Sequence, residues 1–234
     1  MGRHPQQPGT KGSQLHLQRL VNDPADPLGR MLRERQVLAP HETVTWLSPL
    51  ASDDFAEYRD EAFIARLGLH SARMDVPLAK FWPAHGPQWD ALAQTSRRRF
   101  LLIEGKSHRS ELVSHCAARN ARSLTKIRRA LQQAQAFCHG DSATDWSLRH
   151  YQVANRLAHL YWLRQLNGID AHLVFAYFVN DAAMRGPTSA EAWQVEIARV
   201  HSRLGLTDDP MPGFVHHLFV DVTSAPDRQH PGAQ

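Results

Sequence analysis

Uninterrupted apolar runs mark the strands that this chain is expected to bury. Residues 100–103 read Phe-Leu-Leu-Ile between three arginines and Gly105, and residues 173–179 form a longer run of seven apolar residues. Runs without polar alternation are typical of strands that are buried on both faces of a sheet. We therefore expect two adjacent central strands here, and a last strand over residues 214–222.

Most other apolar positions recur at helical spacing. With Asp53-Asp54 and Ser189 as N-caps, this pattern predicts helices at residues 32–37, 55–67, 111–139, 146–166 and 189–204. Residues 74–82, which contain Pro77, predict an additional strand at a sheet edge. Strands and helices in this order predict an α/β fold, a three-layer sandwich in which helices flank a mixed central sheet on both faces.

A length of 234 residues favours one domain. Residues 1–24 are rich in Pro, Gly and Gln with few large apolar groups, so we expect a disordered N-terminal tail. Residues 25–224 form the predicted domain, and residues 225–234 are a C-terminal tail. No apolar run reaches the roughly 20 residues that span a bilayer, and no secretory signal is recognisable. We expect a cytoplasmic protein without a membrane partner.

Three functional groups stand where the apolar run of residues 100–103 ends. On a strand, Glu104 and Lys106 share one face and Gly105 points to the other. Residues 88–95 can pair with this strand as a hairpin, which puts Asp90 opposite Glu104. Opposed residues have Cβ atoms about 5 Å apart, close enough for two carboxylates to share one divalent cation. Without a cation the two carboxylates would repel each other.

Asp90, thirteen intervening residues and then Glu104-Gly105-Lys106 resemble the D…(D/E)xK signature of the PD-(D/E)XK nuclease superfamily. The resemblance covers residues 55–179, and the order of the predicted elements is also that of the superfamily core. One departure is that Trp89, rather than a proline, precedes Asp90.

This resemblance implies that Asp90, Glu104 and the backbone carbonyl of Gly105 hold Mg²⁺, for which Mn²⁺ can substitute. It implies that Lys106 orients the attacking water or steadies the developing negative charge. Lys106 as a Schiff-base amine is disfavoured, because two adjacent carboxylates would raise its pKa rather than lower it.

Other polar residues are candidates to complete the site. They are Glu57 and Glu61 on the helix of residues 55–67, His108 one step beyond Lys106, and Gln152, Asn155 and Arg156 on an otherwise apolar helix. Superfamily members often add an acidic residue from their first helix, which singles out Glu61 or Glu57. The alternatives are solvated charges for the acids, a strand end for His108, and hydrogen bonds within the core for Gln152 and its neighbours.

Basic residues cluster on the predicted helix of residues 111–139. Arg119, Arg122, Lys126 and Arg129 recur at spacings of three, four and three. Such a stripe is expected either to contact phosphates along a nucleic-acid backbone or to be a solvated helix face.

Composition adds little to this assignment. Lys and Arg number 27 against 23 Asp and Glu, and the pI of about 9.4 is compatible with nucleic acid, for which we expect DNA ahead of RNA.

Two cysteines far apart predict reduced thiols. The fifteen histidines lack the spacing of a zinc motif, and His216-His217 reads as a strand pair. A homodimer is a further expectation.

The sequence thus predicts a magnesium-dependent nuclease that hydrolyses phosphodiester bonds of nucleic acid. The alternative is a catalytically inactive, nuclease-like protein for nucleic-acid binding or assembly, in which Glu104 and Lys106 form a salt bridge.

Overall fold

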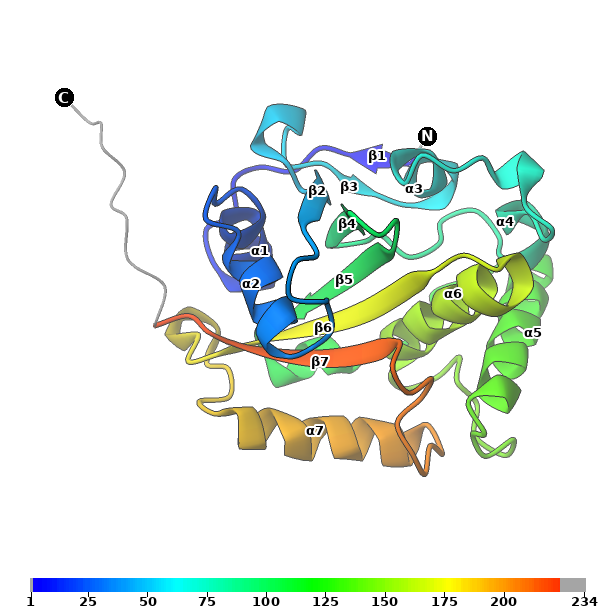
Figure 1. The fold of residues 1–234 in the computed structure, drawn as a ribbon. Coiled ribbons are helices and arrows are strands. Elements are labelled where there is room, and N and C mark those ends of the chain that lie inside the picture. Colours follow the sequence, from blue (N-terminus) through cyan, green and yellow to red (C-terminus); the bar gives the residue numbers. More distant parts are fainter. Residues whose placement is uncertain (1, 224–234) are drawn as a thin grey trace.

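A five-stranded mixed sheet forms the centre of the protein (Figure 1). The computed structural model describes residues 2–223. In spatial order the strands are β2 (Val44–Ser48), β4 (Ala91–Thr95), β5 (Phe100–Lys106), β6 (Ala171–Val179) and β7 (Val215–Asp221). Strand β4 is antiparallel to both β2 and β5, and β5, β6 and β7 are parallel. A small second sheet pairs β1 (Arg3–His4) with β3 (Glu57–Tyr58).

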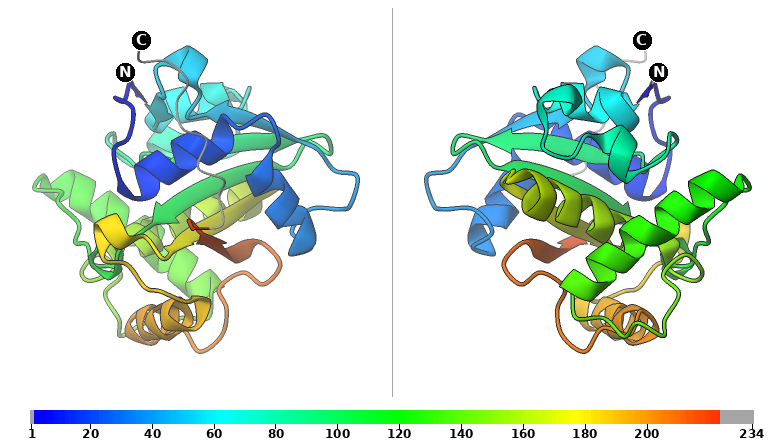
Figure 2. Two further views of the ribbon diagram at one scale, coloured as in Figure 1. Left: turned by 90° about the vertical axis from the view of Figure 1, so that its left-hand side faces the viewer. Right: turned by 90° about the vertical axis from the view of Figure 1, so that its right-hand side faces the viewer.

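Helices cover both faces of the central sheet, as the two views of Figure 2 show. One face carries α1 (Gly12–Val21) and α2 (Pro27–Glu34), which bury a separate apolar cluster against β4 to β7. The helices that contribute to the other core are α3 (Asp60–Arg66), α4 (Leu78–Phe81), α5 (Ala121–Phe137), α6 (Tyr151–Asn167) and α7 (Ala190–Arg203). The predicted three-layer α/β sandwich is therefore confirmed.

The predicted hairpin of β4 and β5 is present in the predicted register. Ala91 pairs with Ile103, so Asp90 stands one position beyond the last pair and across from Glu104. Arg98 takes the left-handed conformation in the turn, with φ of 62°. The apolar run of residues 173–179 lies in β6, which is buried throughout and runs parallel to β5, with Phe175 beside Glu104.

Three C-terminal elements also agree with the sequence pattern. Helix α6 ends as predicted before Gly168, whose φ of +62° ends the helix in the left-handed conformation, although it begins at Tyr151 rather than at Trp146. Ser189 caps α7 by accepting a hydrogen bond from the N–H of Ala192. Strand β7 falls within the predicted residues 214–222. The predicted C-terminal tail, residues 225–234, lies outside the described residues.

The prediction of a disordered tail over residues 1–24 was wrong. Helix α1 lies in that segment and packs Leu17 and Val21 into the core. Two contacts with distant parts of the chain hold it, a His16–Asp181 pair at 2.8 Å and the close approach of Leu17 to Gly105. Polar composition misled the prediction, because a ten-residue helix covers a sheet with few apolar side chains.

Other element predictions were wrong where turns interrupt the pattern. Residues 55–67 contain β3 and then α3, and residues 74–82 contain α4 instead of a strand. The edge strand next to β4 is β2, which the sequence pattern did not reveal. The predicted helix of residues 111–139 is helical only from Ala121, because residues 113–119 are irregular and Asn120 provides the N-cap. The first short helix covers Pro27–Glu34 rather than residues 32–37.

The packing of α1 leads to a stability prediction. Leu17→Ala should destabilise the protein by about 2–5 kcal/mol, because it opens a cavity between α1 and the sheet. Urea unfolding measures the change, and Arg19→Ala, an exposed position on the same helix, is the matched control. Equal stability of the two variants would show that α1 does not pack on the sheet.

Candidate active site

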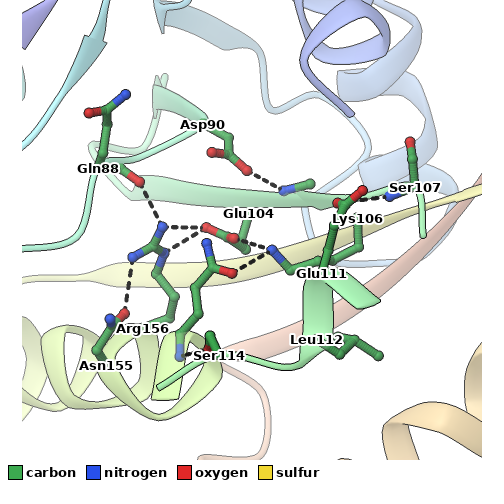
Figure 3. Close-up of polar contacts among 12 residues, drawn as sticks. Gln88, Asp90, Glu104, Lys106, Ser107, Glu111, Leu112, Ser114, Asn155 and Arg156 are labelled. Atoms are coloured by element: carbon green, nitrogen blue, oxygen red, sulfur yellow. Dashed lines mark hydrogen bonds and ion pairs between the residues drawn. The ribbon is translucent and has the colours of Figure 1, made fainter. Parts of the chain in front are cut away.

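A buried carboxylate held by two cations lies at the centre of the site (Figure 3). Glu104 on β5 has no exposed surface. Its Oε1 accepts a hydrogen bond from Nζ of Lys106, and its Oε2 accepts one from Nε of Arg156 at 2.6 Å. Burial opposes the ionisation of Glu104, but the two cations outweigh it and hold the pKa of this carboxyl below its usual value.

Arg156 connects three parts of the chain at this point. It projects from α6, and besides binding Glu104 it donates a hydrogen bond from Nη2 to the carbonyl oxygen of Gln88 at 2.7 Å. Its guanidinium also lies over the ring of Trp89, 4.8 Å from the centroid. Because Gln88 and Trp89 lead directly into β4, Arg156 positions the segment that carries Asp90.

Asp90 reaches the site from the entry to β4. Its Oδ2 accepts a hydrogen bond from the backbone N–H of Gly105 at 2.8 Å. Burial, followed by repulsion from Glu104, raises the pKa of Asp90 well above its usual value, and the neighbouring cations offset this only in part. The structure therefore brings Asp90 beside Glu104. In this environment the Asp90 carboxyl loses its proton less readily than an exposed aspartic acid does.

Gly105 lies in β5 between two contacts, with α1 packed against its Cα and Asp90 bound to its backbone N–H. A Cβ atom at this position would come within 2.8 Å of Leu17 Cδ1 and 3.0 Å of Ser13 Cβ, so a side chain would force these two residues of α1 to shift. The N–H and C=O of one strand residue point to the same neighbouring strand. Since the N–H of Gly105 binds Asp90, its carbonyl faces that side too.

Two further carboxylates surround the cluster. Glu57 on β3 accepts a hydrogen bond from the side-chain amide of Gln88 at 2.5 Å. Glu111, in the short 3₁₀ turn after β5, accepts one from the N–H of Ser107 at 3.2 Å. Burial is the main cause that raises the pKa of both carboxyls, and repulsion from Glu104 adds to it.

The cluster contains more acids than bases. Its described carboxylates are Glu57, Asp90, Glu104 and Glu111, and its cations are Lys106 and Arg156. The three carboxyls with raised pKa are partly buried, whereas Glu104 and both cations are buried. Two negative charges are thus uncompensated when all four acids ionise, and this excess lies at the edge nearest to solvent.

The candidate accessory residues have different locations. Gln152 belongs to the cluster, because its Oε1 accepts a hydrogen bond from Lys106 Nζ at 3.1 Å. Glu61 is exposed on α3, so Glu57 and not Glu61 is the acid of that segment that lies at the site. His108 caps the turn that follows β5, where its Nδ1 accepts a hydrogen bond from the N–H of Ser110.

The basic stripe is shorter than the spacing suggested. Arg119 precedes α5, which begins at Ala121, and so does not share its helical face. Arg122, Lys126 and Arg129 do, and they border a groove between α5 and the segment that contains α4.

Sequence reasoning missed one member of the cluster and left the partner of another undetermined. Glu111 was expected in a long helix, and Arg156 was singled out only as a polar residue in need of a partner. An arginine in the middle of an apolar helix is the signal that pointed to the second cation, because a buried guanidinium requires a buried anion. No comparable signal pointed to Glu111.

Comparison with family models, with curated proteins and with solved structures gave no match. None of the helices within residues 2–223 is long and apolar enough to cross a membrane.

The raised pKa of Asp90 predicts how stability depends on pH without divalent metal. A carboxyl whose pKa is raised on folding loses its contribution as the pH rises from its ordinary value of 3.8 through the raised one. As the pH rises above about 4 the free energy of unfolding should therefore fall, by at most about 1.4 kcal/mol per pH unit for each such group.

Urea unfolding in EDTA at several pH values measures this slope. Asp90→Asn should flatten it, whereas Asp208→Asn at an exposed position should leave it unchanged. If Asp90→Asn instead destabilises the protein by about 3–5 kcal/mol at every pH, as the removal of one partner of a buried ion pair does, the carboxylate has a structural role.

Proposed function

We propose that this protein is a metal-dependent nuclease that hydrolyses nucleic-acid phosphodiester bonds at the cluster around Glu104. Among residues 2–223, the grouping of four carboxylates with only two cations, in which three of the carboxylates are partly exposed, is the observation that carries the proposal. Partly buried carboxylates that repel one another are costly, and a divalent cation relieves that cost when it binds. The hairpin that holds them also matches the D…(D/E)xK pattern.

The donor set fits Mg²⁺, with Mn²⁺ as a substitute. Mg²⁺ takes hard oxygen ligands and usually keeps several waters beside one or two carboxylates. The carboxylates of Asp90 and Glu104 and the carbonyl of Gly105 would hold it. When bound, the ion would polarise the phosphodiester and lower the pKa of a water molecule.

The protein's own cations have separate roles in this proposal. Lys106 Nζ is fixed between Glu104 and Gln152, so it is positioned to stabilise negative charge that develops on a phosphate oxygen or to orient the attacking water. Arg156 keeps Glu104 ionised at neutral pH, because it is a main cause of the lowered pKa of that carboxyl.

The groove on α5 is the proposed path for the rest of the nucleic acid. The cations that line it are Lys80, Arg122, Lys126 and Arg129. Among its lining residues there is no acid, which suits a polyanion. Leu166 at the groove is ten residues beyond Arg156 on α6, or about 15 Å along the helix. About four base pairs cover that distance, and we propose DNA ahead of RNA in keeping with the hairpin motif.

A second candidate function is nucleic-acid binding or assembly without cleavage. It is favoured by the pairing of Glu104, since both of its oxygens are bound by buried cations and its charge is balanced without a metal. The whole cluster would then be a structural ion network.

In either case the two cysteines are unpaired, which suits the reducing cytoplasm where we propose that the protein acts.

Cleavage assays separate the two functions. The wild type should cleave DNA with Mg²⁺ or Mn²⁺ and should be inactive in EDTA. Asp90→Asn should abolish both cleavage and Mn²⁺ binding because it removes one of the anions that hold the ion. Lys106→Ala should abolish cleavage but leave Mn²⁺ bound, which calorimetric titration with Mn²⁺ would detect.

Asp90→Asn is preferred to Glu104→Gln as the diagnostic variant. Neutralising Glu104 leaves two buried cations without their partner, and should cost about 3–5 kcal/mol of stability by itself. An Asp90→Asn protein that is folded by circular dichroism and still binds Mn²⁺ as the wild type does would contradict the proposal. Wild-type binding of DNA without cleavage in either metal would favour the second function.

Binding to the groove has its own test. Replacing Arg122 and Arg129 together by Gln should weaken DNA binding and reduce the log–log salt slope by about 0.9 for each lost phosphate contact. Arg128→Gln is the matched control, because Arg128 is also on α5 but lies 3.8 Å from Asp145 on another side of the helix. Fluorescence anisotropy at several salt concentrations gives the slopes, and equal slopes for all three proteins would exclude the groove.

A further inference from the structure

Three potential metal ligands meet at the end of α7, away from the carboxylate cluster. His201 is in the last turn of α7, Asp209 is in the following loop, and His217 is on β7. One donor atom from each lies within 4.8 Å of the other two. Figure 1 shows that the loop after α7 leads directly back to β7, so the fold itself brings these segments together.

One ring nitrogen of His217 has no hydrogen-bond partner in the described part of the chain and is free to bind a metal ion. Its Nδ1 lies 3.3 Å from the hydroxyl oxygen of Tyr177, whereas its Nε2 is buried and has no hydrogen-bond partner among the described residues. A ligating histidine generally donates its other ring N–H to an oxygen in this way, which fixes the ring and leaves the first nitrogen free to bind metal. A buried ring nitrogen without a partner is otherwise costly.

A small cavity lies beside the two histidines. It has a volume of about 10 Å³ and is lined by His201, Pro210 and His217 together with apolar side chains. A volume of this size holds about one water molecule, and a single metal ion is no larger. Burial lowers the pKa of His201 and brings that of His217 to about 4, so both rings are neutral at pH 7 and available as ligands.

The donor set selects the class of metal. Two imidazoles and one carboxylate suit Zn²⁺ and similar transition metals, whereas Mg²⁺ and Ca²⁺ prefer oxygen ligands alone. We propose that His201, Asp209 and His217 bind one Zn²⁺ ion, with water as the fourth ligand. The ion links the end of α7 and its loop to β7.

Binding requires a small local closure. A tetrahedral Zn²⁺ with bonds of about 2.0–2.1 Å holds its ligand atoms roughly 3.3 Å apart, whereas Nδ1 of His201 and Oδ1 of Asp209 are 3.9 Å apart. The side chain of Asp209 is 78% exposed and can supply this movement, while both histidines come from regular elements.

This zinc site is independent of the proposed nuclease site. His217 is in register with Phe175, and Phe175 with Glu104, so the two sites are two strands apart, or about 10 Å along the sheet. The sites share no residue. Asp90→Asn should therefore leave Zn²⁺ binding unchanged, and failure of one proposal does not affect the other.

Titration of the metal-free full chain, without a histidine tag, tests the proposal. With excess Mg²⁺ present to occupy the proposed nuclease site, Co²⁺ should bind with one ion per chain and give the visible absorption of a site with nitrogen ligands, and Zn²⁺ should displace it. Asp209→Ala and His217→Ala should each weaken Zn²⁺ affinity by more than about tenfold, since even outer partners of a metal site contribute that much. Zn²⁺ should raise the melting temperature of the wild type but not that of Asp209→Ala.

His216→Ala is the matched control, because His216 neighbours His217 on β7 but pairs with His172 instead. This variant should bind Zn²⁺ as the wild type does. Asp209 is exposed, so its replacement tests the site even if His217→Ala does not fold. Absence of stoichiometric binding, or Zn²⁺ binding that is unchanged in Asp209→Ala and His217→Ala, would overturn the proposal.

Discussion

The burial of Glu104 is the constraint on which the arrangement around the central sheet depends. A carboxylate without exposed surface is stable as an anion only when paired charges and hydrogen bonds replace its water. Lys106 supplies one partner from the same strand, and Arg156 supplies the other from α6. Because Arg156 also binds the carbonyl of Gln88 and lies over Trp89, the same charge fixes α6 and the entry to β4 against β5.

This arrangement separates two kinds of carboxylate at one end of the β4–β5 hairpin. Lys106 and Arg156 keep Glu104 ionised, whereas burial and repulsion from Glu104 raise the pKa values of Asp90, Glu57 and Glu111. The proposed metal would bind between Asp90 and Glu104 and would compensate the negative charge of the second group. Because of this distinction, variants of Asp90 and Glu104 should have different consequences for folding, although the two residues face each other.

Helix α1, on the opposite face of the sheet, restricts the side chain that β5 can carry at position 105. Helix α1 approaches β5 so closely that a side chain at position 105 would require Leu17 or Ser13 to shift, and Gly105 is also the residue whose N–H and carbonyl face Asp90. The N-terminal segment therefore supports the site from behind. A change in α1 packing would be transmitted to Gly105 and its hydrogen bond to Asp90 through direct contact.

The sequence by itself determined the buried strands, the β4–β5 register and hence the juxtaposition of Asp90 and Glu104, because period-two alternation and a short hairpin loop leave little freedom. The end of α6, the N-cap of α7 and strand β7 followed from equally local signals. Only the tertiary structure decided the pairing of Glu104 with Arg156, the choice of Glu57 over Glu61, the docking of α1 and the meeting of His201, Asp209 and His217. These contacts join residues far apart in the chain, and whether a polar residue is solvated or paired depends on which segments pack together, which local patterns do not encode.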